Sequence, residues 1–205
     1  MKRIIIALLA TVAAINVSAQ ELNLGVVGGV NFAWERAKTA GAALSSDSYL
    51  GFQLGAKMEM DMSALMAKGF FLEGSLLYNL KGNNYAGSHS NLGYLQLPIN
   101  LGYRLSLTGN LSLMATAGPY AAIGVLGKDV VKTNDAKIKT NIFGKEYQRF
   151  DFGLNYKLGV ELWRQWQLYV GFEQGLLNMS KQKVDLGLDS NRKVLNIYLG
   201  TAYMF

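Results

Sequence analysis

Among the residues that could take part in catalysis, the first to consider is a single histidine. His89 is the only histidine of the chain and stands between Ser88 and Ser90. A neutral imidazole can activate a hydroxyl for nucleophilic attack. A catalytic triad, however, is defined by geometry in the fold and not by adjacency in the sequence. We therefore interpret His89 as a solvated histidine, and we predict no enzymatic activity, no cofactor and no bound metal.

A larger set of charged residues stands at alternate positions on one side of strand-like segments. Its carboxylates could form acid–base pairs or hold a metal ion. Basic residues occupy the same side in nearly equal number, and buried charges persist only when they are paired and hydrogen-bonded. We therefore predict a structural ion-pair network rather than a reaction centre. Its members are Lys57, Glu59, Asp61, Glu73, Lys81, Arg104, Arg149, Asp151, Lys157, Glu161 and Glu173.

The elements that must position these charges show a period of two. In the stretch 149–162 (RFDFGLNYKLGVEL) apolar residues alternate with charged residues, Asn and Gly. This alternation is typical of a β-strand with two different faces. The pattern predicts eight strands, at 22–34, 50–61, 70–81, 94–105, 111–123, 149–162, 166–176 and 193–205.

The connections between the predicted strands alternate in length. The short ones are 62–69, 106–110 and 163–165, and the long polar ones are 35–48, 82–91, 126–148 and 179–192. Long loops at one end and tight turns at the other are typical of an up-and-down transmembrane barrel. A Greek-key sandwich gives no reason for this sorting. We therefore predict an all-β fold, an eight-stranded antiparallel up-and-down barrel.

The distribution of charge decides which face of the barrel meets lipid. The apolar faces carry no charge in their central stretches, where Lys or Arg would cost about 2–4 kcal/mol at the bilayer midplane. A barrel of eight strands has an interior just wide enough for side chains to fill. Aromatic residues fall near both ends of the strands, as expected at the two membrane interfaces. The charged face is therefore predicted to line the lumen, and the apolar face to contact lipid.

The N-terminus carries an export signal. Lys2 and Arg3 precede an apolar run over 4–15, and small residues end the segment before Gln20. This pattern predicts a signal peptide at 1–19 and a barrel domain at 20–205. Removing Lys2 and Arg3 from the 20 basic residues leaves 18 against 14 acidic residues, a net charge of about +4. That charge gives no reason to expect nucleic acid as a partner, and the absence of cysteine excludes disulfides.

Four segments of the mature chain resemble a known family. They are YLQLPINLGY (94–103), AGPYAAIGV (117–125), RFDFGLNYKLGVEL (149–162) and YLGTAYMF (198–205). The chain is similar in plan to the outer-membrane barrels of the OmpA/OmpX type, often labelled porin family proteins. The resemblance implies an outer-membrane location with both termini in the periplasm and long extracellular loops. It also implies assembly by the barrel insertion machinery and periplasmic chaperones, with a C-terminal signal formed by Ile197, Leu199, Tyr203 and Phe205.

Two of the long connections, 126–148 and 179–192, are rich in lysine. Their cations could meet lipopolysaccharide phosphates or a surface partner. Within the first of them, KIKTNIF (137–143) also alternates, so it could extend a strand above the membrane and offer an exposed edge.

The function expected from these observations is structural, surface-interacting or adhesive, with a polar lumen filled by side chains. A narrow pore for small solutes or ions is the first alternative. A lipid-modifying enzyme that uses His89 is the second. A lipocalin-like carrier would need an apolar lumen, which the predicted inward charges contradict.

Overall fold

The computed structural model describes residues 22–39, 42–45, 48–85, 88–133, 136–141, 148–178 and 191–205, so the predicted signal peptide lies outside the described residues. Two short strands, β2 (Ala42–Ser45) and β7 (Ala136–Asn141), lie beside the barrel wall. The wall consists of β1 (Leu22–Thr39), β3 (Tyr49–Asp61), β4 (Phe70–Tyr85), β5 (Ser88–Thr108), β6 (Leu111–Thr133), β8 (Phe150–Leu162), β9 (Trp166–Gly175) and β10 (Asn191–Met204).

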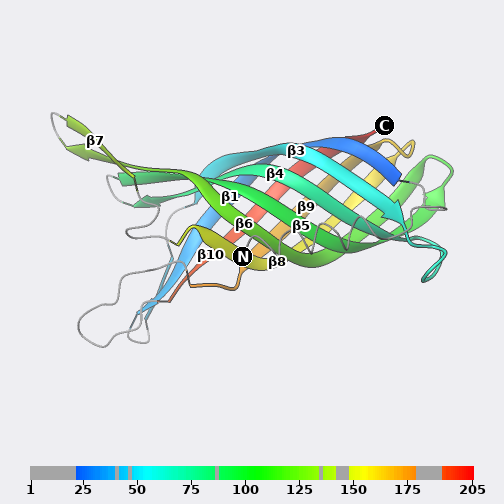
Figure 1. Cartoon of the computed structure of the whole chain (residues 1–205), viewed down its shortest axis with the longest axis horizontal. Coiled ribbons are helices and arrows are strands. Elements are labelled where there is room, and N and C mark those ends of the chain that lie inside the picture. The colour runs from blue at the N-terminus through cyan, green and yellow to red at the C-terminus, as the bar shows by residue number, and fades with distance from the viewer. Residues whose placement is uncertain are drawn as a thin grey trace, which may run out of the picture.

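The eight wall strands form a closed antiparallel barrel, as predicted (Figure 1). Neighbours follow the chain in the order β1, β3, β4, β5, β6, β8, β9 and β10, and β10 pairs with β1 from Lys38↔Asn191 to Gly25↔Met204. Closure removes the free edges that an open sheet would expose to hydrocarbon. Among the described residues, no helix has the length and apolar character needed to cross a membrane.

The two faces of the wall differ sharply in polarity. Leu54 on β3 and Leu158 on β8 face outward with 61% and 64% of their surface exposed. Glu73 on β4 and Glu173 on β9 face inward and are each 1% exposed. The apolar side is thus the outside of the barrel, and the charged side is its interior.

Several strands are longer than the sequence predicted. β4 and β5 continue through most of the predicted loop 82–91, and β6 and β7 occupy much of the predicted loop 126–148. The expectation that the strands end before these long polar connections was wrong here, whereas the strand extension expected within 137–143 is confirmed at β7. Backbone pairing continues beyond the apolar band, where the alternation of hydrophobicity in the sequence fades.

These extensions form two lobes at one end of the barrel, which we call the long end (Figure 1, left). The β4–β7 lobe comprises residues 81–85, 88–92, 126–133 and 136–141, and β7 pairs there with β6 alone among the described strands. The β1–β2–β10 lobe comprises residues 34–39, 42–45 and 191–195. Tight connections at 62–69, 109–110 and 163–165 lie at the opposite, turn end, as does the C-terminus.

Both prolines of the chain interrupt hydrogen bonding around the same part of β5. The β4–β5 pairing stops at Gly74↔Ile99 and resumes at Leu77↔Gln96, across Pro98. The β5–β6 pairing stops at Pro98↔Tyr120 and resumes at Leu101↔Ala117, across Pro119. Proline lacks the amide that a ladder needs. The disturbance expected at Pro98 is therefore a gap in the ladder, and the register shifts on β5–β6 lie elsewhere, at Gly93/Tyr94 and Ser106/Thr108.

Glycines on the inner wall make room for aromatic rings. The register sets four inward aromatic residues directly opposite a glycine on the next strand, namely Phe71↔Gly102, Tyr120↔Gly153, Tyr169↔Gly200 and Tyr198↔Gly171. A Cβ atom added to any of these glycines would overlap the facing ring. The rings therefore cover bare backbone, which leaves space for polar side chains at the centre.

We predict that Gly171→Ala destabilises the folded barrel by about 1–3 kcal/mol, because the Tyr198 ring must leave its place. Urea unfolding in detergent micelles measures the change. The matched control is Gly28→Ala, since an added Cβ there meets no atom within 4 Å. Equal effects of the two substitutions would contradict this packing.

Candidate functional site: the polar lumen

The lumen holds two layers of paired charges, of which the first lies towards the turn end. Lys57 Nζ is 2.9 Å from Glu59 and 2.8 Å from Glu73. Arg104 Nη2 is 2.6 Å from Glu59 and 2.8 Å from Glu161. Lys157 also pairs with Glu73. β3, β4, β5 and β8 thus meet across the lumen through charges that their alternating patterns place inside.

An amide ties this first layer together. Gln167 donates hydrogen bonds to Glu59 at 3.0 Å and to Glu161 at 2.8 Å, and its carbonyl accepts one from Lys57 at 2.5 Å. The Arg104 guanidinium also lies 4.7 Å from the centre of the Phe71 ring. These contacts satisfy donors and acceptors that would otherwise be stranded without water.

The second layer lies towards the long end and is centred on Glu173. Lys81 Nζ is 2.7 Å from this carboxylate. Its oxygens also accept hydrogen bonds from three amides, those of Gln96, Asn155 and Asn196, at 2.5, 3.2 and 3.0 Å. One carboxylate therefore joins strands β4, β5, β8, β9 and β10.

Asp151 lies beside this second layer without a basic partner in the ion pairs of the described residues. Its Oδ2 accepts a hydrogen bond from the Tyr120 hydroxyl at 3.0 Å, while Oδ1 is buried without a hydrogen-bond partner. Lys81 Nζ instead lies over the Tyr120 ring, 5.1 Å from its centre.

Asparagine side chains connect the two layers. Asn100 donates to Glu73 of the first layer at 2.9 Å and to Asn155 at 3.4 Å. Asn155 in turn donates to Glu173 of the second layer at 3.2 Å. The polar network therefore runs continuously along the described part of the lumen.

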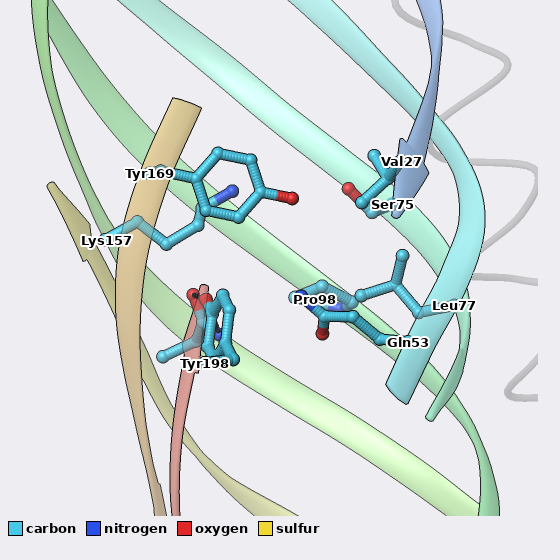
Figure 2. A pocket seen from close by; sticks show the side chains of 9 residues that line it. Val27, Gln53, Ser75, Leu77, Pro98, Lys157, Tyr169 and Tyr198 are labelled. Carbon is cyan, nitrogen blue, oxygen red and sulfur yellow. Dashed lines mark hydrogen bonds between the residues drawn. The ribbon is translucent and has the colours of Figure 1, made fainter. Parts of the chain in front are cut away.

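A small cavity remains between the layers (Figure 2). Tyr169, Tyr198 and Lys157 approach it from one side, and Gln53, Ser75 and Pro98 from the other. Its volume of about 10 Å³ is roughly the space of one water molecule. No group of three or more residues suited to holding a metal ion occurs among the described residues.

The structure places nine of the eleven predicted network residues inside the barrel. The prediction was wrong for Asp61 and Arg149, which are exposed at opposite ends. Asp61 accepts a hydrogen bond from the Ser63 backbone at 2.6 Å, and Arg149 lies just before β8 begins. Both stand at positions that the alternation assigns to the inward face, but Asp61 is the last residue of β3 and Arg149 immediately precedes β8.

The sequence interpretation missed the amides that complete the network. The sequence did contain a signal for these amides, because they stand at the same alternate positions of the strands as the inward charged residues. They are Asn31, Asn79, Gln96, Asn100, Asn155, Gln167 and Asn196, all at most 2% exposed. His89 falls within β5, and its side chain lies outside the described part of the structure.

A closed eight-stranded barrel with an apolar exterior and a filled polar interior defines a class of small integral outer-membrane proteins. The model of the family described as "Outer membrane protein beta-barrel domain" matches residues 5–205, and this chain belongs to that family. The protein is thus an outer-membrane β-barrel of the OmpA/OmpX type.

Solved structures of similar barrels accompany this match. Ail, the attachment invasion locus protein of Yersinia pestis, is 18% identical; the match covers 90% of this chain and 99% of that one, with a TM-score of 0.45. Neisserial surface protein A is 10% identical, with coverage of 92% and 100% and a TM-score of 0.46. A search of curated proteins gives no match.

We predict that Lys81→Met destabilises the barrel by about 3–5 kcal/mol, because it leaves Glu173 charged and buried without its cation. The double variant Lys81→Met/Glu173→Leu should recover much of this loss, since neither charge then remains. Urea unfolding of the wild type, both single variants and the double variant gives the coupling energy.

The rim variant Asp61→Asn serves as the control and should cost less than about 0.5 kcal/mol. Strictly additive effects of the Lys81 and Glu173 substitutions would show that the two side chains do not act as a pair.

Proposed function

We propose that this protein is a non-enzymatic outer-membrane barrel that closes its own lumen and presents two strand lobes for surface interaction. The observation that carries the proposal is the filling of the lumen by paired charges and amides, with a remaining cavity of about 10 Å³. The interior of an eight-stranded barrel is just wide enough for side chains to fill, so we expect the described part of this lumen to leave no continuous path for a hydrated solute.

The orientation we propose places the lobes at the cell surface and the tight turns in the periplasm. Barrels of this class have short periplasmic turns and longer extracellular connections. The last strand reaches this turn end, where the Phe205 amide donates a hydrogen bond to the Leu24 carbonyl oxygen at 2.8 Å. Ile197, Leu199 and Phe205 are 41%, 53% and 74% exposed on the outer face, where the assembly machinery could contact the last strand.

The lobes supply the surface-interacting part of the proposal. β7 pairs with β6 along one of its two edges, and no other described strand pairs with β7. An unpaired edge can accept an extended segment of another protein through backbone hydrogen bonds. An adhesive or structural role at the surface uses this arrangement more directly than transport does.

We expect the refolded protein to produce no resolved conductance steps in a planar bilayer. The double variant Tyr169→Gly/Tyr198→Gly should produce small steps, because both rings line the cavity between the two charged layers. Heat-modifiable gel mobility controls for folding of each sample. Regular conductance by the wild type would favour the narrow pore instead.

We also expect cells that express the protein to keep an unchanged pattern of lipid A acylation. The same pattern should result from the His89→Ala variant, because the neighbouring Ser88 and Ser90 do not form a catalytic triad by adjacency in the sequence alone. Mass spectrometry of extracted lipid A measures both. A changed pattern that disappears on His89→Ala would establish the enzymatic alternative.

A further inference from the structure

The two charged layers of the lumen differ in their balance of charge. The first layer has as many basic as acidic side chains, namely Lys57, Arg104 and Lys157 with Glu59, Glu73 and Glu161. In the described lumen, the second layer has one basic side chain, Lys81, beside two acidic ones, Glu173 and Asp151. If every group were ionised, the second layer would therefore hold one uncompensated negative charge.

The single cation of the second layer is already paired. Lys81 Nζ lies 2.7 Å from Glu173, and 5.9 and 5.1 Å from the centres of the Tyr94 and Tyr120 rings. None of the ion pairs among the described residues includes Asp151. Lys81 and Glu173 both act on Asp151 electrostatically, but with opposite signs. The ion pair therefore presents little net charge to the second carboxyl group.

The surroundings of Asp151 exclude water. Its side chain is 2% exposed, and Ala122 of a buried, mainly apolar cluster stands directly opposite it on β6. A buried carboxylate without a cation is costly, and such a group usually takes up a proton instead. The described titratable side chains of this layer come from five other strands, and they are Lys81 on β4, Tyr94 on β5, Tyr120 on β6, Glu173 on β9 and Tyr198 on β10.

The two oxygens of Asp151 have different surroundings. Oδ2 accepts the hydrogen bond of the Tyr120 hydroxyl at 3.0 Å, whereas Oδ1 is buried without a hydrogen-bond partner. Oδ1 lies 3.5 Å from the position that a Cβ atom of Gly175 would take, and the Val194 carbonyl oxygen lies 3.0 Å from the same point. The missing side chain leaves room for a proton on Oδ1 to face that carbonyl. Oδ1 is thus the oxygen suited to carry a proton.

We propose that the second layer is a proton-binding site, in which Asp151 Oδ1 holds one proton at neutral pH. The layer has two carboxyl groups and one ammonium group, and the bound proton makes its total charge zero. Asp151 then acts as a neutral acid that accepts from Tyr120 through Oδ2 and can donate through Oδ1. The closed lumen is in this way balanced in charge along its whole described length.

Infrared spectroscopy of the folded protein in detergent tests the proposal directly. At neutral pH the wild type should show the carbonyl stretch of a protonated carboxylic acid, and labelling of aspartate with carbon-13 should shift this band. Asp151→Asn should remove the band, whereas Asp61→Asn at the exposed rim should keep it. A wild type without the band, or a band that survives in Asp151→Asn, would overturn the proposal.

A second variant tests whether charge balance holds the proton. Glu173→Gln removes the carboxylate that pairs with Lys81, so Asp151 becomes the only acidic group that can balance this cation. The band should therefore disappear from Glu173→Gln, although Asp151 is still present. Heat-modifiable gel mobility checks that the variant folds. Persistence of the band in the folded variant would show that the balance of charge does not set the protonation of Asp151.

The stability of the barrel should depend on pH through the same proton. In the unfolded chain an aspartate ionises at about pH 4. At higher pH the folded barrel would thus bind one proton more than the unfolded chain, so its stability falls as pH rises. The folding equilibrium constant of the wild type, relative to that of Asp151→Asn, should fall about tenfold per pH unit between about pH 5 and pH 7. Urea unfolding measures this ratio, and a ratio that stays constant with pH would contradict a bound proton.

A sodium comparison distinguishes a proton from a bound cation. Replacing sodium chloride by choline chloride at equal ionic strength should leave the ratio of the two folding constants unchanged. A tenfold or larger loss of stability confined to the wild type would assign the site to sodium and overturn the proposal. None of these measurements depends on conductance or on which end of the barrel faces the cell exterior, so a failure of the proposed function leaves them interpretable.

Discussion

The structure depends on one constraint, which is that backbone polar groups inside hydrocarbon must bond to each other. A sheet satisfies this condition only when its first and last strands join, as β1 and β10 do along fourteen paired positions from Gly25 to Lys38. Closure also determines how the interior is filled, because eight strands enclose a space that side chains occupy and that is too narrow for bulk water. The pairing is interrupted beside both prolines, which adjoin the central part of β5, and the β5–β6 register also shifts at Gly93/Tyr94 and Ser106/Thr108.

The enclosed charges follow from the same closure. Nine ionisable residues predicted for the lumen lie inside it, and eight of them form ion pairs that join strands distant in sequence. Such pairs add little net stability compared with apolar packing, but breaking one leaves a stranded charge. A network of this kind therefore resists partial opening. Its continuity through Asn100 and Asn155 makes the lumen one polar core rather than two separate sites.

Much of this could be predicted from alternation alone, because a barrel strand shows lipid one face and the lumen the other. The strands around Leu54 and Leu158 and the inward placement of Glu73 follow directly from that pattern. The strand extensions could not be predicted, since the sequence around residues such as Asn84 and Thr140 does not alternate between apolar and polar residues. The β5–β6 register shift at Gly93/Tyr94, which leaves Val125 of β6 without a partner on β5, could not be predicted either, because Val125 and Leu126 are both apolar and both exposed. Asp61 and Arg149 stand at positions that the alternation assigns to the inward face, but both lie at the rims of the barrel, where an inward position is no longer buried.

The central claim is that lipid touches the apolar face while the charges are enclosed. The chain has no cysteine, so single cysteines at position 54, 158 or 73 can each carry one spin label. In liposomes, labels replacing Leu54 and Leu158 should collide readily with lipid-dissolved oxygen and poorly with a water-soluble nickel chelate. A label replacing Glu73 should be shielded from both reagents. Shielding of the labels at 54 and 158 from oxygen, with free access of the nickel chelate, would contradict the account.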